Sequence, residues 1–168
     1  NEVLNFISES DALTGCMNRR GFIEKTLQMN RDHEGEELLI LFADLDHLKE
    51  INDSFGHIEG DFSIRHCAEV LKKVVGADGI VGRIGGDEFC VVTLGNLKDG
   101  QQIIERIREE SDAFNCTSDK EYYVELSAGC TSVICRNGLV IADALREADR
   151  ALYEVKKLRR NSVKKIRL

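Results

Sequence analysis

The stretch from Leu38 to Ala43 is an unbroken run of apolar residues. It is too short for a typical helix, and the absence of a polar face favours a strand that is covered on both sides. Such a strand needs packed elements above and below it. The run therefore predicts a single domain built as a sheet with helices packed on it.

Three further segments have the pattern of strands. Apolar residues at 80–84 and 89–92 flank Gly85-Gly86-Asp87-Glu88, and two such runs around a Gly-Gly turn predict a β-hairpin. Residues 122–128 alternate between apolar and polar side chains, as a half-buried strand does. Val163 to Ile166 is expected to add an edge strand. The hairpin makes at least part of this sheet antiparallel.

Apolar residues at helical spacing predict the remaining elements. Asn18 is expected to cap the second helix, and the last helix carries its apolar side chains from Ile141 to Val155. The fold class is therefore α+β, an α/β sandwich with a central mixed, largely antiparallel sheet. Residues 1–10 are expected to form a lead-in helix or linker from a longer N-terminal region, and residues 11–168 the domain itself. The expected helices cover residues 1–10, 18–30, 47–55, 59–75, 99–114 and 141–155.

Charge and cysteine content limit the classes of function. The formal net charge of −7 argues against a protein that follows a nucleic-acid backbone, although it allows a small phosphorylated substrate. The six cysteines form no C-x-x-C pair and lie mostly in apolar runs, which is typical of reduced thiols in the cytoplasm. No apolar stretch reaches the roughly 20 residues that span a bilayer. We therefore expect no membrane contact by this domain, although a missing N-terminal part could anchor the full-length protein.

Acidic residues stand where the predicted strands end. Asp44 closes the apolar strand, and Asp87 and Glu88 lie at the hairpin tip. Clustered carboxylates repel one another unless a cation lies between them, and hard oxygen ligands suit Mg²⁺. For any single Asp beside Gly the alternative is simple turn formation.

A basic group lies near the end of the chain. Lys156 and Arg160 are spaced i, i+4, so they share a face if the last helix continues that far. One interpretation is a solvated helix end whose cations complement the helix dipole. The other is a phosphate clamp that faces the metal site.

These residues fall within five ordered motifs that resemble those of the GGDEF family of diguanylate cyclases. The resemblance extends from about Asp11 to Asn161, nearly the whole chain, which is more specific than one pentapeptide. It implies a nucleotidyl-cyclase or palm-like fold. The motifs are Asp11–Gly15 with Asn18–Arg20, Phe42–Asp53 with Gly56–His57 and Gly60–Asp61, Arg83–Phe89, Ser127–Gly129, and Ala148–Lys156.

The resemblance implies a role for each matching residue. Asp87 and Glu88 would be the catalytic residues. The metal, Mg²⁺ or alternatively Mn²⁺, would be held by Asp44, Asp87, Glu88 and the Leu45 carbonyl. The expected substrate-binding residues are His47 and Leu48 through their main-chain N–H groups, Asn52 and Asp61 at the guanine edge, Gly85 and Gly86, and Lys156 and Arg160 on the terminal phosphates.

The implied reaction condenses two GTP molecules into cyclic di-GMP and pyrophosphate, in bacterial second-messenger signalling. Because one domain holds one GTP, two domains would have to meet as a homodimer, driven by a missing N-terminal sensory region. The principal alternative is a catalytically inactive GGDEF module that binds GTP or cyclic di-GMP as a regulatory sensor. A cyclase with altered base choice and a purely structural domain are further alternatives. Asp61 argues against the former, and no positive feature of the sequence supports the latter.

Overall fold

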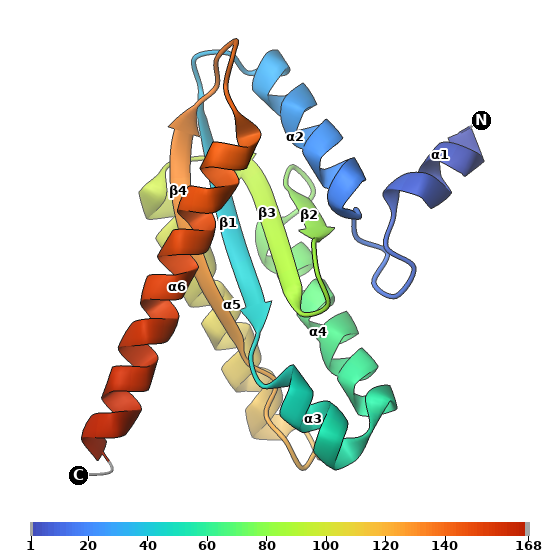
Figure 1. Ribbon diagram of the computed structural model, residues 1–168, viewed down its shortest axis with the longest axis vertical. Coiled ribbons are helices and arrows are strands. Elements are labelled where there is room, and N and C mark those ends of the chain that lie inside the picture. The colour runs from blue at the N-terminus through green and yellow to red at the C-terminus, as the bar shows by residue number, and fades with distance from the viewer. Residues whose placement is uncertain (1, 167–168) are drawn as a thin grey trace.

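The computed structural model describes the backbone of residues 2–166 and the side chains of residues 2–4 and 8–158. Figure 1 shows a central sheet with helices on both faces. The elements in chain order are α1 (Glu2–Glu9), α2 (Arg19–Asp32), β1 (Glu37–Leu45), α3 (Leu48–Phe55), α4 (His57–Val75), β2 (Ile80–Arg83), β3 (Glu88–Leu94), α5 (Leu97–Thr117), β4 (Leu126–Ile134) and α6 (Ile141–Ile166).

The sheet has four strands in the order β2-β3-β1-β4, and each neighbouring pair is antiparallel. The predicted α+β fold is confirmed, and so is the predicted hairpin, which is formed by β2 and β3. Among the described residues, the one parallel pairing is an isolated bridge between Met17 and Gly82, a residue of β2. The mixed character that the sequence predicts is thus confined to this bridge.

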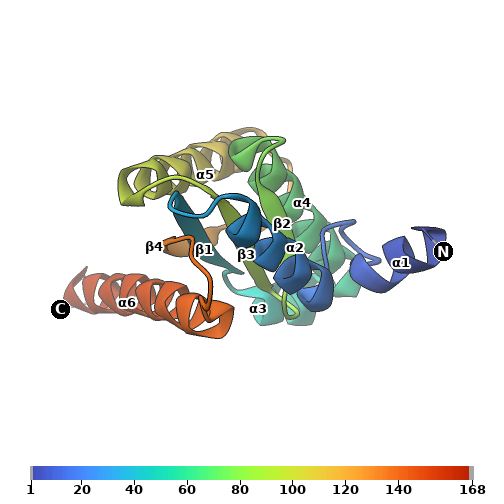
Figure 2. The same ribbon diagram turned by 90° about the horizontal axis from the view of Figure 1, so that it is seen from above.

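β1 is buried along almost its whole length because helices cover both faces of the sheet. Figure 2 shows α4 and α5 on one side and α2 and α6 on the other. Alternate residues of β1 point to opposite layers, as the pleat of a strand requires. Leu41, Ala43 and Leu45 belong to the core under α4 and α5, whereas Leu38, Ile40 and Phe42 pack against α2 and α6.

Helix starts follow the local chemistry of the sequence. The predicted cap at Asn18 is confirmed, since its side chain accepts a hydrogen bond from the Gly21 N–H. At the start of α5, Asn96 and Asp99 form a reciprocal capping box. No helix in the described part of the chain is both long enough and apolar enough to cross a membrane.

Two predicted strand boundaries are wrong. The alternating segment becomes a strand only at Leu126. Leu126 pairs with Leu45, the last residue of β1, and the chain beyond Leu45 turns into α3, so the residues before Leu126 have no strand to pair with. The backbone of Val124 instead exchanges hydrogen bonds with the Asn115 side chain. The expected edge strand at Val163–Ile166 is the last part of α6.

Candidate functional site

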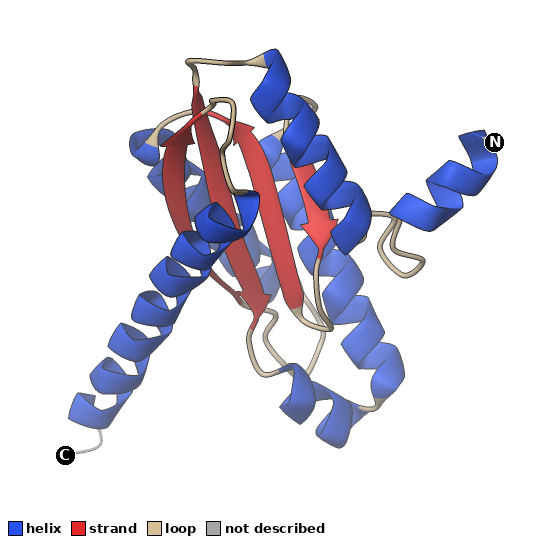
Figure 3. Ribbon diagram, turned by 45° about the horizontal axis from the view of Figure 1, so that its top comes forward, coloured by secondary structure: helices blue, strands red, loops and turns tan. Residues whose placement is uncertain are grey.

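The acidic residues meet at one end of the sheet. β1 ends there while β3 and β4 begin, because both neighbours run antiparallel to it (Figure 3). Asp44 lies opposite Glu88 on one side and Ser127 on the other. The Leu45 N–H donates to the Asp87 carbonyl at 2.9 Å. The structure thus gathers the four predicted metal ligands at one edge.

Asp44 is largely buried, with a side chain that is 15% exposed. Burial raises its pKa to about 6. The Lys156 ammonium opposes that shift, whereas the nearby Asp87 carboxylate adds to it. One carboxylate oxygen, Oδ2, accepts a hydrogen bond from Lys156. The other, Oδ1, is buried and has no hydrogen-bond partner among the described residues.

Lys156 reaches Asp44 because α6 crosses β4 in close contact. A Cβ atom placed on Gly129 would lie 2.2 Å from the backbone nitrogen of Leu152, so any larger residue would push the helix away. Lys156 follows one turn later on the same helix. Lys156 was expected as part of a phosphate clamp, and the structure places its ammonium on the Asp44 carboxylate. The side chain of its expected partner, Arg160, lies outside the described residues.

The turn after β1 is strained. His47 has φ 60° and ψ 30°, which makes it the one non-glycine residue with positive φ in the described chain. Its side chain is exposed, and α3 begins at the next residue, Leu48. The turn is held at Asp46, whose N–H donates to the Glu125 carbonyl at 2.9 Å and whose carboxylate accepts from the Ser127 hydroxyl at 2.7 and 2.9 Å. His47 and Leu48 thus open a helix beside the acidic edge.

The two residues expected to read the base lie on neighbouring helices. Asn52 belongs to α3 and Asp61 to α4. A Cβ atom on Gly60 would lie 1.8 Å from Asn52 Oδ1, so this glycine lets the Asn52 side chain pack directly on the first turns of α4. Asp61 is exposed to solvent. The structure therefore brings Asn52 next to the residue that precedes Asp61.

The signature turn between β2 and β3 differs from the tight hairpin that its two glycines predict. Neither Gly85 nor Gly86 has a positive φ, and the turn closes through the Ile84 N–H and the Glu88 carbonyl at 2.8 Å. A Cβ atom on Gly86 would meet nothing within 4 Å. Steric crowding by this chain therefore does not require a glycine at that position, and the space above it is open.

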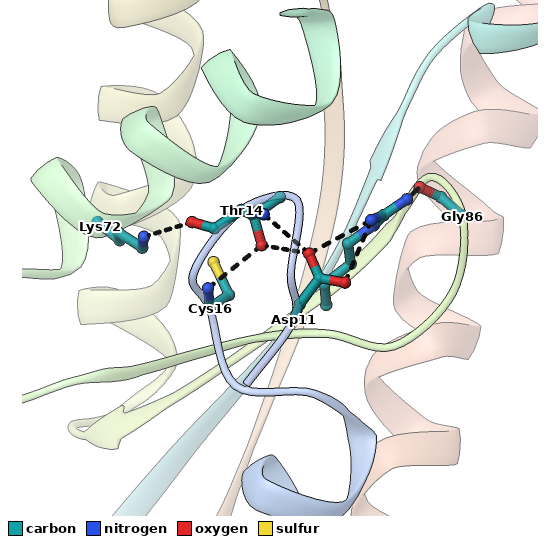
Figure 4. Close-up of polar contacts among 6 residues, drawn as sticks. Asp11, Thr14, Cys16, Lys72 and Gly86 are labelled. Carbon is teal, nitrogen blue, oxygen red and sulfur yellow. Dashed lines mark hydrogen bonds and ion pairs between the residues drawn. The ribbon is translucent and has the colours of Figure 1, made fainter. Parts of the chain in front are cut away.

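Arg83 and Asp11 hold this turn from outside. Arg83 donates two hydrogen bonds to the Gly86 carbonyl, at 2.8 and 3.2 Å, and contacts both carboxylate oxygens of Asp11 at 3.2 and 3.3 Å. Figure 4 shows Asp11 beside Thr14, whose hydroxyl donates to the Asp11 carboxylate, and Lys72 bound to the Thr14 carbonyl. Arg83 and Asp11 both belong to the motifs identified in the sequence, but no role was predicted for either of them. The available signal was the position of an arginine immediately before the turn.

The donor set suits a hard divalent cation. The two neighbouring carboxylates of Asp44 and Asp87 supply oxygen atoms of the kind that such a cation prefers, and Asp44 Oδ1 has no hydrogen-bond partner among the described residues. Among the described side chains, however, no three His, Cys, Asp or Glu residues converge on one point. Mg²⁺ often needs only one or two protein carboxylates when phosphate oxygens complete its shell.

Comparison with known proteins gives a consistent result along the chain. The family model described as "Diguanylate cyclase, GGDEF domain" matches residues 8–162. The diguanylate cyclase DgcP of Escherichia coli K12 is 38% identical over 155 residues, which cover 89% of this chain and 45% of DgcP. The cyclic di-GMP phosphodiesterase NbdA of Pseudomonas aeruginosa is 31% identical over 162 residues, which cover 95% of this chain and 21% of NbdA. The chain thus spans less than half the length of these relatives.

Solved structures share the arrangement of elements. The coiled coil and GGDEF domain of DgcB from Caulobacter crescentus, solved in complex with c-di-GMP, superposes with a TM-score of 0.82 and 26% sequence identity. The match covers 93% of this chain and 84% of that one. The sheet order and the helices on both faces are therefore those of a known domain type.

Proposed function

The chain belongs to the GGDEF diguanylate cyclase family, and from this premise we propose that it joins two GTP molecules into cyclic di-GMP with release of pyrophosphate. The observation that carries the proposal is the environment of Asp44. Its carboxylate is buried, has a raised pKa and one unpartnered oxygen, and lies beside Asp87 and Lys156. Such an arrangement does little for stability, but it suits a site that binds a cation together with a phosphate group.

Each residue of the site has a proposed task. The N–H groups at the start of α3 bind phosphate oxygens, because unpaired amides and the helix dipole favour negative charge there. The Asp61 carboxylate accepts hydrogen bonds from the guanine ring N–H and amino groups, and the Asn52 amide can both donate and accept at the same edge. The open space above Gly86 lets a nucleotide approach the backbone. Lys156 exchanges its contact with Asp44 for the terminal phosphates, and Arg160 is proposed to bind the same phosphates.

Asp44, Asp87, Glu88 and the Leu45 carbonyl are the residues that would hold Mg²⁺ or Mn²⁺. When bound, the cation supplies charge stabilisation at the reacting phosphate and lowers the pKa of the attacking 3′-hydroxyl. Displacement of the Lys156 ammonium from Asp44 frees that carboxylate for the cation and makes the lysine available to the substrate at the same moment. The free thiols of all six cysteines support a cytoplasmic setting.

A second candidate is a GGDEF module that binds GTP or cyclic di-GMP without turnover. The similarity to the phosphodiesterase NbdA favours it, since this chain matches a fifth of a protein named for the opposite reaction. Both candidates use the same pocket residues. They differ in whether the bound nucleotide reacts.

The deciding experiment is incubation of the protein with GTP and Mg²⁺, followed by chromatography of the products. We expect cyclic di-GMP and pyrophosphate, and we expect Asp44→Asn and Asp87→Asn to lower the rate by about 100-fold or more, because each removes a ligand of the cation. Circular dichroism should show an unchanged fold.

Asp112→Asn is the matched control, because Asp112 is exposed on α5 and outside the proposed site. Tight GTP binding without any product would support the inactive module instead. Full turnover by either site variant would remove that residue from the catalytic site.

A further inference from the structure

We propose that contacts among Glu59, Lys120 and Tyr122, here called the tether, set the position of the base-reading turn, which is the turn between α3 and α4. These three would then be positioning residues for nucleotide selection. The inference rests on the proposed function, since it concerns how Asn52 and Asp61 are held toward guanine. The contacts and packing that carry it are separate from the acidic edge at Asp44.

The base-reading helices project beyond the sheet. Figure 1 shows α3 and the start of α4 lying past the end of β1, where strand pairing offers no support. The loop between α5 and β4, residues 118–125, comes to the same end of the molecule. That loop therefore lies where it can support the turn between α3 and α4.

The loop contacts α4 through one carboxylate. Lys120 Nζ lies 2.9 and 3.2 Å from the two oxygens of Glu59, and the Tyr122 hydroxyl donates to the same carboxylate. The Lys120 ammonium also lies 4.4 Å from the ring centroid of Phe62, and the ring of Tyr122 is 5.1 Å from that of Phe55. One side chain of the tether therefore contacts each of the two base-reading helices through an aromatic ring.

These contacts are shielded enough to matter. The side chains of Lys120 and Glu59 are 28% and 29% exposed, unlike the open ion pairs elsewhere on the surface. Burial and, after it, the hydrogen bond to Glu59 raise the pKa of Tyr122 to about 12, so its hydroxyl stays a donor at neutral pH. Charge-assisted hydrogen bonds of this kind are stronger than neutral ones.

The loop is itself fixed to the core. Asn115 on α5 donates to the Val124 carbonyl at 3.0 Å and accepts from the Val124 N–H at 2.9 Å. Val124 is 2% exposed and belongs to the core under α4 and α5. The tether therefore joins α4 to a rigid part of the molecule rather than to a mobile loop.

Glu59 stands immediately before the residues that matter for the base. Gly60 follows it and packs on Asn52, and Asp61 comes next. A displacement of Glu59 therefore moves Asp61 and, at the same time, changes the packing of the Asn52 side chain on Gly60. Selection between GTP and ATP depends on polar groups that pair with the base at fixed distances. Loss of the tether should therefore weaken GTP binding and the discrimination against ATP, and should leave the rate of the chemical step nearly unchanged.

The test uses Tyr122→Phe, which keeps the ring, and Lys120→Met, which keeps most of the stem but removes the charge. We expect KM for GTP to rise about tenfold in each, with kcat within about twofold of the wild type and a smaller preference for GTP over ATP. Lys120→Arg should restore most of the wild-type KM.

Lys73→Met is the matched control. Lys73 pairs with Glu110 at 2.9 Å and also joins α4 to α5, but at the opposite end of α4. Urea unfolding compares the stability of the Lys120→Met and Lys73→Met variants. If the Lys120 contact were purely structural, both substitutions would lower stability and neither would change KM.

Calorimetry with GTP and ATP separates the two levels of the proposal. If the wild-type protein neither binds nor converts GTP, the proposed function fails and the tether role fails with it. If the wild type is selective for GTP and the Lys120 and Tyr122 variants keep its KM and its selectivity, the tether role alone is wrong.

Discussion

His47 is a residue whose backbone is held in an unfavourable conformation by its neighbours. A non-glycine residue in the left-handed region costs on the order of 1–3 kcal/mol when the surroundings impose it. The constraint comes from the two residues before it, since Leu45 is bonded to the signature turn and Asp46 to Glu125 and Ser127 at the start of β4. The strain thus lies where the proposed phosphate-binding amides begin.

His47→Gly tests this strain directly. Relief of the strain and the larger chain entropy of glycine, about 0.5–1 kcal/mol, act in opposite directions. We expect the free energy of unfolding in urea to stay the same or rise by up to about 1 kcal/mol, whereas His47→Val should lower it by about 1–2 kcal/mol.

His57→Gly is the control, because His57 is an exposed histidine at the first position of α4 with no positive φ to relieve. It should be neutral or destabilising. A clear loss of stability in His47→Gly would show that the turn is not strained.

At the scale of single residues, the sequence predicts which acidic residues lie close together, but it does not predict the side-chain contacts that hold the turn carrying them. Asp44, Asp87 and Glu88 each follow or precede an apolar run, so strand ends place them at one edge. The contact of Arg83 with Asp11 joins residues far apart in the chain. Nothing in the local pattern of either segment specifies that pairing.

Among the elements, the turn after α1 and the β2–β3 hairpin are joined by one carboxylate. Burial alone would raise the pKa of Asp11, but hydrogen bonds from Thr14 and the Arg83 guanidinium outweigh it and hold the pKa below its ordinary value. The native state therefore favours the ionised form. Its stabilisation is present above pH 3.8, the ordinary pKa, and is lost as pH falls through the lower native pKa.

Asp11→Asn should lower the free energy of unfolding by about 1–3 kcal/mol at pH 7, because hydrogen bonds to a charged group are lost. The difference from the wild type should shrink as the pH is taken below about 3.8, where the wild-type carboxylate protonates too. Urea unfolding at pH 7 and at low pH measures both effects.

Asp143→Asn serves for comparison, because Asp143 pairs with Arg146 on an open helix surface where both side chains are more than half exposed. It should change stability little at either pH. A loss of stability in Asp11→Asn that is the same at both pH values would exclude an electrostatic origin.

The elements themselves were largely predictable because local rules and tertiary packing agree. The cap at Asn18 and the buried run of β1 are examples. The start of β4 was not, since alternation continues through Tyr122 and Val124 but β1 has already turned away. The end of α6 was not either, because Val163 and Ile166 are three residues apart, a spacing that suits a helix as well as an irregular apolar run.

At the scale of the whole molecule, each domain offers one acidic edge and one pair of proposed base readers, while the proposed product requires two nucleotides. A single domain is therefore half of the proposed catalyst. We expect the specific activity of the isolated domain to rise with protein concentration, because two copies must meet by diffusion. A parallel dimeric zipper fused before Asn1 should raise it further through effective concentration.

The measurement is the initial rate per mole of enzyme across a dilution series, with light scattering to give the mass in solution. A fusion to a monomeric partner of similar size is the control for the zipper. Constant specific activity from a species that stays monomeric throughout would contradict the two-domain requirement.

The central place of β1 in the sheet also affects how the domain folds during synthesis. It is the first strand of this domain to be synthesised, yet both strands that flank it, β3 and β4, follow later in the chain. The most apolar segment therefore keeps one edge unpaired until β3 has been made and the other edge unpaired until β4 has been made. Sheets that depend on such distant pairings form slowly and are prone to aggregate while incomplete. The strand that organises the finished molecule is thus the one that leaves the nascent chain most dependent on protection during synthesis.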